Sequence, residues 1–179
     1  VLALFARFTF HGGAGVYAGL TSLMGGGAVA GGLLIATRNR PDIHRLTAIG
    51  TVFGLFILAV AVAPDLPAAL VLIFPMGAAS IAFIATANAT LQLRAEPTMR
   101  GRVMALYAIA FLGTTPIGSP LVGWISQTWS PRVALAVGGT ATIVASVIVR
   151  RHHRQEHLRT PAVPPVVDEA EPGTELGVA

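Results

Sequence analysis

The sequence predicts an all-α membrane protein that crosses the bilayer several times, and three observations support this fold class. Of the 179 residues, 54% are hydrophobic and only 11% are charged, whereas a soluble domain usually carries about 25% charged residues. The mean hydropathy is +0.71. The apolar residues fall into long runs, and every cationic residue other than histidine is an arginine. A chain of this composition is expected to have lipid as its solvent.

Five apolar runs are long enough to cross a bilayer core of roughly 30 Å, which takes about 20 helical residues. They cover approximately residues 16–37, 46–63, 67–91, 103–127 and 133–149. Residues 1–10, VLALFARFTF, are expected to be the end of a sixth helix, because the chain opens in hydrophobic sequence without a methionine or a signal-peptide pattern. We therefore expect residues 1–150 to form a transmembrane helical bundle truncated at its N-terminus.

Residues 151–179 are expected to form a disordered cytoplasmic tail. They change from basic to proline-rich to acidic and contain too few apolar residues to build a core. His153 and His157 are four residues apart in this tail. Two histidines without a third ligand are a weak metal motif, so we favour a solvated patch that faces lipid headgroups.

The most informative stretch runs from Asn88 to Trp124, where an arginine-rich corner joins two apolar segments. No charged residue or histidine lies between Leu66 and Leu93 or between Val103 and Pro131. Charge at the centre of a bilayer costs about 2.5–3.5 kcal/mol per residue on insertion scales. A membrane helical hairpin is therefore predicted, with three arginines confined to its corner: Arg94, Arg100 and Arg102.

Arginine also predicts the orientation of the bundle. If all five runs span the membrane, ten of the twelve arginines lie on one side, and only Arg7 and Arg132 lie on the other. Cytoplasmic loops of membrane proteins carry an excess of cations. The side that holds loops 38–45 and 94–102 is therefore expected to be cytoplasmic, together with the C-terminal tail.

Glycines in the first span predict close helix packing. Gly15 and Gly19, and then Gly27 and Gly31, are spaced four residues apart, and small residues let helix backbones approach each other in lipid. A glycine hinge is the less favoured interpretation.

Several function classes find no support in the sequence. The chain has no cysteine, which excludes disulfides, thiolate nucleophiles and cysteine-bound metals. It has no paired acids within a span and no hydrolase or zinc-protease motif, so we expect no enzymatic activity and no cofactor. The arginines sit between apolar runs and form no patch with aromatic residues, so nucleic acid is not an expected partner.

The segments RAEPTMRGRVMALY (94–107) and FLGTTPIGSPLVGW (111–124) resemble the major facilitator superfamily, more narrowly its bacterial drug and siderophore exporters, similar to enterobactin exporters. The resemblance covers about residues 1–150 and is most specific over 86–124. It implies two six-helix halves, with the five spans as helices eight to twelve and residues 1–10 as the end of helix seven. The chain would then be the C-terminal half without its first part.

Two family motifs are partly present. Residues 32–40, GLLIATRNR, are similar to the cytoplasmic G-x-x-x-D-R-x-G-R signature, but Ala36 stands where the family has an acid. The resemblance therefore implies no salt bridge from that position. Residues 118–124, GSPLVGW, are similar to the glycine-proline motif of antiporters, with Ser119 separating the first glycine from the proline.

The resemblance also implies where substrate would pass. In the family, helices seven, eight, ten and eleven line the central cavity, and the polar residues of this chain are concentrated in the matching spans. It places six side chains near the cavity: Tyr17, Thr21, Asn88, Tyr107, Thr114 and Thr115. The structural alternative is hydrogen bonding between helices, which we favour for the threonines and weigh equally for Asn88.

Two further groups have candidate mechanical roles. Prolines weaken the helix turn before them, so a bending element, or else static close packing, is expected at Gly113, Pro116, Gly118, Pro120 and Gly123. Cytoplasmic arginines are expected to anchor the bundle to headgroups or helix C-termini, or to gate against the other half: Arg38, Arg40, Arg100 and Arg102.

The expected function is transport, most specifically efflux of a drug or siderophore-like small molecule across the bacterial inner membrane by alternating access. No carboxylate or lysine lies in any of the five spans, so an ion-coupling residue would lie outside this chain. The expected partners are membrane lipid, the small-molecule substrate and the missing N-terminal half. The alternative is a non-transporting half-transporter, scaffold or remnant.

Overall fold

The computed structural model describes residues 2–10, 13–37 and 42–159, and these residues are helical apart from short connections. Two short segments, α1 (Leu2–Leu4) and the π-helical η1 (Phe5–Thr9), precede five long helices. The long helices are α2 (Ala14–Ala36), α3 (Ile43–Ala61), α4 (Leu66–Arg94), α5 (Arg100–Thr128) and α6 (Pro131–Arg159). Each is long and apolar enough to cross a membrane. The predicted all-α, multi-span fold class is therefore confirmed.

The starts of α3, α4 and α6 are encoded locally by polar residues next to the apolar runs, whereas α2 and α5 begin without a side-chain cap. Asp42 accepts a hydrogen bond from the Ile43 amide at 2.6 Å, and Asp65 accepts one from the Ala68 amide at 3.0 Å. Ser130 accepts a hydrogen bond from the Val133 amide at 3.2 Å. Such caps satisfy backbone donors that the first helical turn leaves without partners.

Helix α6 differs from the prediction because it continues to Arg159, beyond the expected boundary at residue 150. The apolar run ends at Val149, but the following residues contain neither glycine nor proline before Pro161. Arginine, glutamine and glutamate favour helix almost as much as leucine does, so polar residues extend the helix past the apolar layer. Residues 151–159 thus belong to α6, and the rest of the predicted tail, 160–179, lies outside the described residues.

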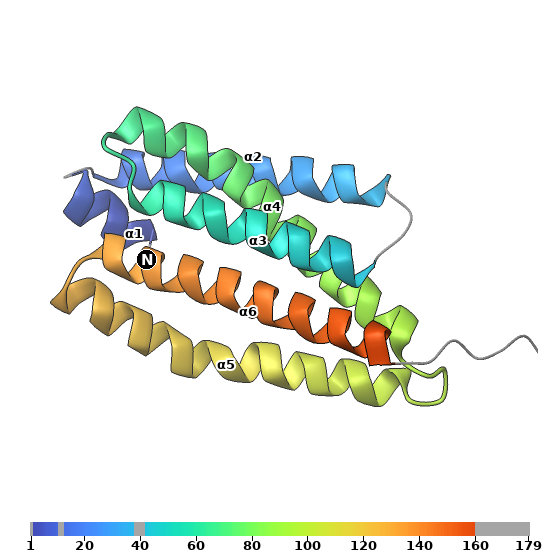
Figure 1. Cartoon of the computed structure of the whole chain (residues 1–179). Coiled ribbons are helices and arrows are strands. Elements are labelled where there is room, and N and C mark those ends of the chain that lie inside the picture. Colours follow the sequence, from blue (N-terminus) through green and yellow to red (C-terminus); the bar gives the residue numbers. More distant parts are fainter. Residues whose placement is uncertain (1, 11–12, 38–41, 160–179) are drawn as a thin grey trace, which may run out of the picture.

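The long helices run side by side along one direction, and consecutive ones are antiparallel (Figure 1). One end of the bundle holds the α4–α5 corner and the C-terminal end of α6, with Arg94, Arg100, Arg102 and Arg150. We call this the arginine-rich end. The opposite end carries η1, the α3–α4 turn and the α5–α6 turn, with Arg7 and Arg132, and we call it the arginine-poor end.

Glycines determine which helices touch most closely. A Cβ atom on Gly27 would overlap the carbonyl oxygen of Phe74, and one on Gly31 would overlap the backbone of Ala78. From the other side, a Cβ on Gly77 would overlap the Met24 carbonyl. Helices α2 and α4 therefore pack backbone to backbone, as predicted for Gly27 and Gly31.

Gly15 and Gly19 do not pack in this way within the described residues, because a Cβ on Gly15 would meet nothing within 4 Å and one on Gly19 would meet Leu70 Cδ2 at 3.9 Å. A second close contact, not predicted, joins α3 to α6. There a Cβ on Gly54 would lie 2.9 Å from the Gly139 carbonyl oxygen and 2.6 Å from Ile143 Cγ1.

The main cluster of buried side chains lies towards the arginine-poor end. Its largest fully buried members are Phe5, Leu20, Val60 and Ile73, from η1, α2, α3 and α4. Helix α5 contributes nothing to this cluster. It lies along α6 at the edge of the bundle (Figure 1), and none of the residues in its most apolar window is buried.

Candidate functional site

Tyr17 and Thr21 lie one turn apart on α2, close to the arginine-poor end. Thr21 Oγ1 donates a hydrogen bond to the Tyr17 carbonyl oxygen at 2.8 Å, and Tyr17 is 44% exposed. Tyr17 also lines a small cavity of about 270 Å³ together with Arg7 of η1. Its phenol is therefore accessible for a contact outside this helix.

Asn88 lies near the other end of the bundle, six residues before the end of α4. Its side-chain Oδ1 is buried, and among the described residues it is the one buried side-chain nitrogen or oxygen atom that has no hydrogen-bond partner. A buried polar atom left unsatisfied costs about 1–3 kcal/mol. The Asn88 amide oxygen thus lacks a donor within the described residues.

The threonines around Asn88 differ from it because each is satisfied within its own helix. Thr86 Oγ1 donates to the Ala82 carbonyl and Thr90 Oγ1 donates to the Thr86 carbonyl, both at 2.7 Å. Thr114 on α5 donates to the Ala110 carbonyl at 2.5 Å. Thr21 and Thr114 therefore donate no hydrogen bond to another helix of the described chain. Their hydroxyl lone pairs remain available as acceptors.

Tyr107 belongs to the first turns of α5, where its ring stacks on Phe111 with centroids 5.9 Å apart and planes 22° apart. The predicted polar stripe of α5 therefore begins with an aromatic pair near the arginine-rich end. Thr114 lies two turns further on and is exposed. Thr115 is helical, but its side chain lies outside the described ones.

These candidates are spread along the bundle rather than gathered at one point. At a rise of about 1.5 Å per residue, Thr21 lies about 10 Å from the start of α2, and Asn88 lies about 9 Å from the end of α4. The two residues therefore lie near opposite ends of the bundle. An arrangement of this kind can offer successive polar contacts along the membrane normal, but it is not a single compact site.

Helix α5 continues without interruption through both prolines, Pro116 and Pro120. A Cβ atom on any of its predicted hinge or packing glycines would meet nothing within 4 Å: Gly113, Gly118 and Gly123. These glycines therefore make no close packing contact within the described chain. The bending role stays a prediction.

The cytoplasmic arginine candidates divide into two groups. Arg100 and Arg102 begin α5 and are exposed, and Arg100 Nε donates a hydrogen bond of 3.4 Å to the carbonyl of Ala95, the residue that follows α4. This contact joins the start of α5 to the connection that follows α4. Arg38 and Arg40 lie outside the described residues.

Metal ligands do not gather in the part of the chain that the structure describes, where no three His, Cys, Asp or Glu residues form a group. His153 lies against His44, with ring centroids 5.6 Å apart, rather than standing alone on α6. The side chain of His157, its predicted partner, lies outside the described ones.

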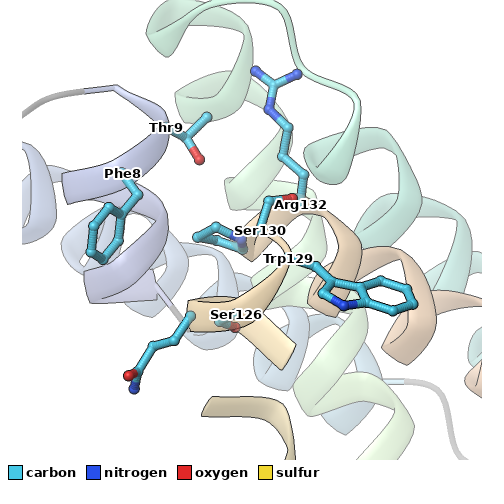
Figure 2. A pocket seen from close by; sticks show the side chains of 8 residues that line it. Phe8, Thr9, Ser126, Trp129, Ser130 and Arg132 are labelled. Carbon is cyan, nitrogen blue, oxygen red and sulfur yellow. The ribbon is translucent and has the colours of Figure 1, made fainter. Parts of the chain in front are cut away.

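The sequence reasoning missed a pocket of about 650 Å³ at the arginine-poor end, between η1 and the turn from α5 to α6. Phe8 and Trp129 lie on either side of the Ser130 turn, while Thr9 and Arg132 lie above it (Figure 2). Arg132 Nη2 donates a hydrogen bond of 2.7 Å to the Ala63 carbonyl and so joins α6 to the α3–α4 turn. A hint was present in the sequence, because Arg132 is one of only two arginines expected on its side of the membrane.

Comparisons with known proteins give one match. Residues 1–165 match a protein family of the major facilitator superfamily described as transmembrane secretion effector. No curated protein and no solved structure matches the chain. Because the matched range includes all of the described residues, the chain belongs to the transmembrane secretion effector family of major facilitator transporters.

Proposed function

We propose that this chain is part of the C-terminal half of an exporter that moves a drug or siderophore-like small molecule across the bacterial inner membrane. It would act by alternating access, in which substrate binding shifts rigid halves between inward-open and outward-open states. It would catalyse no bond-making or bond-breaking step and would need no cofactor. Its tail would be cytoplasmic, and its partners would be lipid, the substrate and an N-terminal half.

The main observation in favour of this proposal is the environment of Asn88. Its buried Oδ1 has no partner within the described chain, and an amide in that state stabilises the fold only when something else donates to it. A substrate hydroxyl or amine, or a donor from the N-terminal half, would supply that hydrogen bond. A scaffold or remnant has no need to keep an incomplete amide within an apolar helix.

The position of helix α5 in the bundle is a second, independent line of support for the same proposal. Its stripe of Tyr107, Phe111 and Thr114 lies on a helix that shares little surface with the rest of the bundle. In a transporter made of two halves, a helix in this position would line the cavity between them. Because the spans hold no carboxylate or lysine, ion coupling would depend on residues outside this chain.

The test is export from efflux-deficient bacteria that express the complete gene product, with ethidium and a labelled catecholate siderophore as probes. Asn88→Leu should weaken export of the transported probe, raising its half-saturating concentration roughly threefold to tenfold, the value of one lost hydrogen bond. Thr142→Val is the matched control, because Thr142 is exposed on α6 and donates to its own Gly138 carbonyl at 2.8 Å.

Three outcomes can be told apart. Export that falls in Asn88→Leu and persists in Thr142→Val supports the proposal. Export that is unchanged in both variants would show that Asn88 does not contact the substrate in the cavity. Wild-type cells that export neither probe would favour the alternative, a half-transporter or scaffold without transport activity.

A further inference from the structure

The pocket at the arginine-poor end has the composition of a binding site for an amphipathic anion. It combines one cation, three hydroxyl side chains, one amide and two exposed aromatic rings: Arg132; Thr9, Ser126 and Ser130; Gln127; Phe8 and Trp129. Phe8 is 56% exposed and Trp129 is 75% exposed. Polar donors therefore lie beside apolar surface at the place where the helices leave the apolar layer.

Arg132 is held in place with most of its donors unused. Its Nη2 bonds the Ala63 carbonyl, whereas a guanidinium has five N–H donors arranged in a planar fork. The nearest acid of the α3–α4 turn, Asp65, directs its carboxylate to the Ala68 amide. No ion pair of Arg132 is recorded within the described chain, so its charge is not neutralised there.

We propose that this pocket binds the phosphate of an anionic phospholipid in the leaflet at the arginine-poor end. The free edge of the Arg132 guanidinium would contact the phosphate oxygens, and the hydroxyls of Thr9 and Ser130 would donate to the remaining ones, because the Ser126 hydroxyl already donates to the Val122 carbonyl. Arginine suits this role because its planar fork matches the geometry of phosphate.

The aromatic residues favour a lipid over a soluble anion. Tryptophan is enriched where helices meet the headgroup layer, because its ring is apolar and its indole N–H is polar. Phe8 and Trp129 flank the turn that presents Ser130 and Arg132 (Figure 2). A lipid whose phosphate lies at Arg132 could therefore place its glycerol backbone and upper chain against these rings, and a free phosphate ion could not.

This inference does not depend on the transport proposal, since it concerns a different end of the bundle and requires no substrate. It also gives Arg132 a role beyond joining two helices. Glutamine is neutral and would not attract an anion, whereas lysine keeps the positive charge and comes nearer to arginine in length.

The experiment measures lipid binding to the complete gene product in detergent by native mass spectrometry, with phosphatidylglycerol and phosphatidylcholine titrated separately. Wild-type protein should bind phosphatidylglycerol more tightly. Arg132→Gln should weaken that binding roughly fivefold, because one cation near a membrane surface is worth about that factor for an anionic lipid. Arg7→Gln is the matched control, since Arg7 is the other arginine of this end and lies outside the pocket.

One further variant and one competition measurement complete the experiment. Arg132→Lys keeps the charge and should keep the preference, which separates loss of binding from loss of folding. A large excess of inorganic phosphate should leave phosphatidylglycerol bound; if it displaces the lipid, the pocket takes a soluble anion and the lipid assignment is wrong. Equal binding of both lipids by the wild type, or equal losses in Arg132→Gln and Arg7→Gln, would also overturn the proposal.

Discussion

At the scale of single residues, polar side chains in this bundle follow two different rules. The hydroxyls of serine and threonine return to a carbonyl of their own helix, as Ser126 does with Val122 and Ser146 does with Thr142. They can therefore occupy an apolar environment without needing a partner on another helix. Asn88 cannot be satisfied in the same way, because a side-chain carbonyl oxygen needs a donor and the backbone N–H groups around it are engaged in the helix.

The first prediction concerns the stability cost of that side chain. In this chain by itself, Asn88→Leu should raise the free energy of unfolding by about 1–3 kcal/mol, because it removes a buried acceptor that has no donor. The measurement is thermal or denaturant unfolding in detergent, followed by circular dichroism.

Thr90→Val is the control for this prediction. Thr90 is only 5% exposed, and its hydroxyl is satisfied by the Thr86 carbonyl. Its loss should cost about 0.5–1.5 kcal/mol. If Asn88→Leu destabilises the chain more than Thr90→Val does, then Asn88 has a donor within this chain, and its assignment to the cavity loses its basis.

At the scale of elements, the bundle combines two tight glycine contacts with one loosely held helix. Helices α2 and α4 touch through Gly27, Gly31 and Gly77, and α3 and α6 touch through Gly54 and Gly139. In lipid, where no hydrophobic effect drives helices together, such contacts supply the packing energy. Helix α5 has no comparable contact, so it is the long helix most able to move relative to the others.

The second prediction uses neighbouring glycines of α2. Gly31→Ala should destabilise the chain by about 1–3 kcal/mol, because the new methyl group would overlap the backbone of Ala78 and push α2 away from α4. Gly32→Ala should be neutral or stabilising by up to about 1 kcal/mol, since its Cβ would meet Ile81 Cγ2 at an ordinary 3.6 Å while alanine favours helix.

Both variants are to be compared by unfolding in mixed micelles with increasing SDS. Equal midpoints for the two variants would show that α2 and α4 do not cross as closely as the structure has it.

The third prediction concerns bending of α5. A proline inside a helix removes a backbone hydrogen bond and costs about 3 kcal/mol. Pro116→Ala should therefore slow amide hydrogen exchange in the turn before residue 116, and in the complete transporter it should slow export of a transported probe.

Pro75→Ala provides the comparison, because Pro75 lies inside α4 next to the glycine contact with α2, where packing already restrains the helix. Export that falls as much in Pro75→Ala as in Pro116→Ala would argue against a bending element specific to α5.

At the scale of the whole molecule, alternation of the helices places the arginine-rich α4–α5 corner at the same end as the C-terminal end of α6 (Figure 1). The excess of cations at that end predicts that it faces the cytoplasm. The chain contains no cysteine, so a single introduced thiol can report its own side of the membrane.

The fourth prediction follows from this orientation. In intact cells, a membrane-impermeant maleimide should label Val62→Cys, which lies at the α3–α4 turn where Val62 is 73% exposed. It should not label Thr98→Cys, which lies in the exposed α4–α5 corner. The complete gene product must first be freed of other cysteines, and permeabilised cells should show labelling at both positions. The reverse pattern would invert the topology.

The fold class and the span positions could be predicted from the sequence because lipid makes local composition decisive. Every backbone group in the apolar layer must be satisfied, and a helix satisfies its own, so a run of apolar residues between polar caps is sufficient to define a span. The same reasoning failed at residue 150, because a helix can continue into water wherever its side chains favour it, and the apolar run does not mark its end.

What the sequence determined by itself is therefore local: five helices, the arginine-rich α4–α5 corner and the polar character of α2, α4 and α5. The tertiary structure decided which of these features meet. Gly15 and Gly31 look alike in the sequence, yet of the two only Gly31 faces another backbone. Thr86 and Asn88 are near neighbours in α4, yet the Thr86 hydroxyl has a hydrogen-bond partner and Asn88 Oδ1 has none among the described residues. The pocket around Arg132 joins η1 to a turn more than a hundred residues later. Such contacts depend on the rotation and separation of whole helices, and these are set by packing across the bundle rather than by the pattern within any one helix.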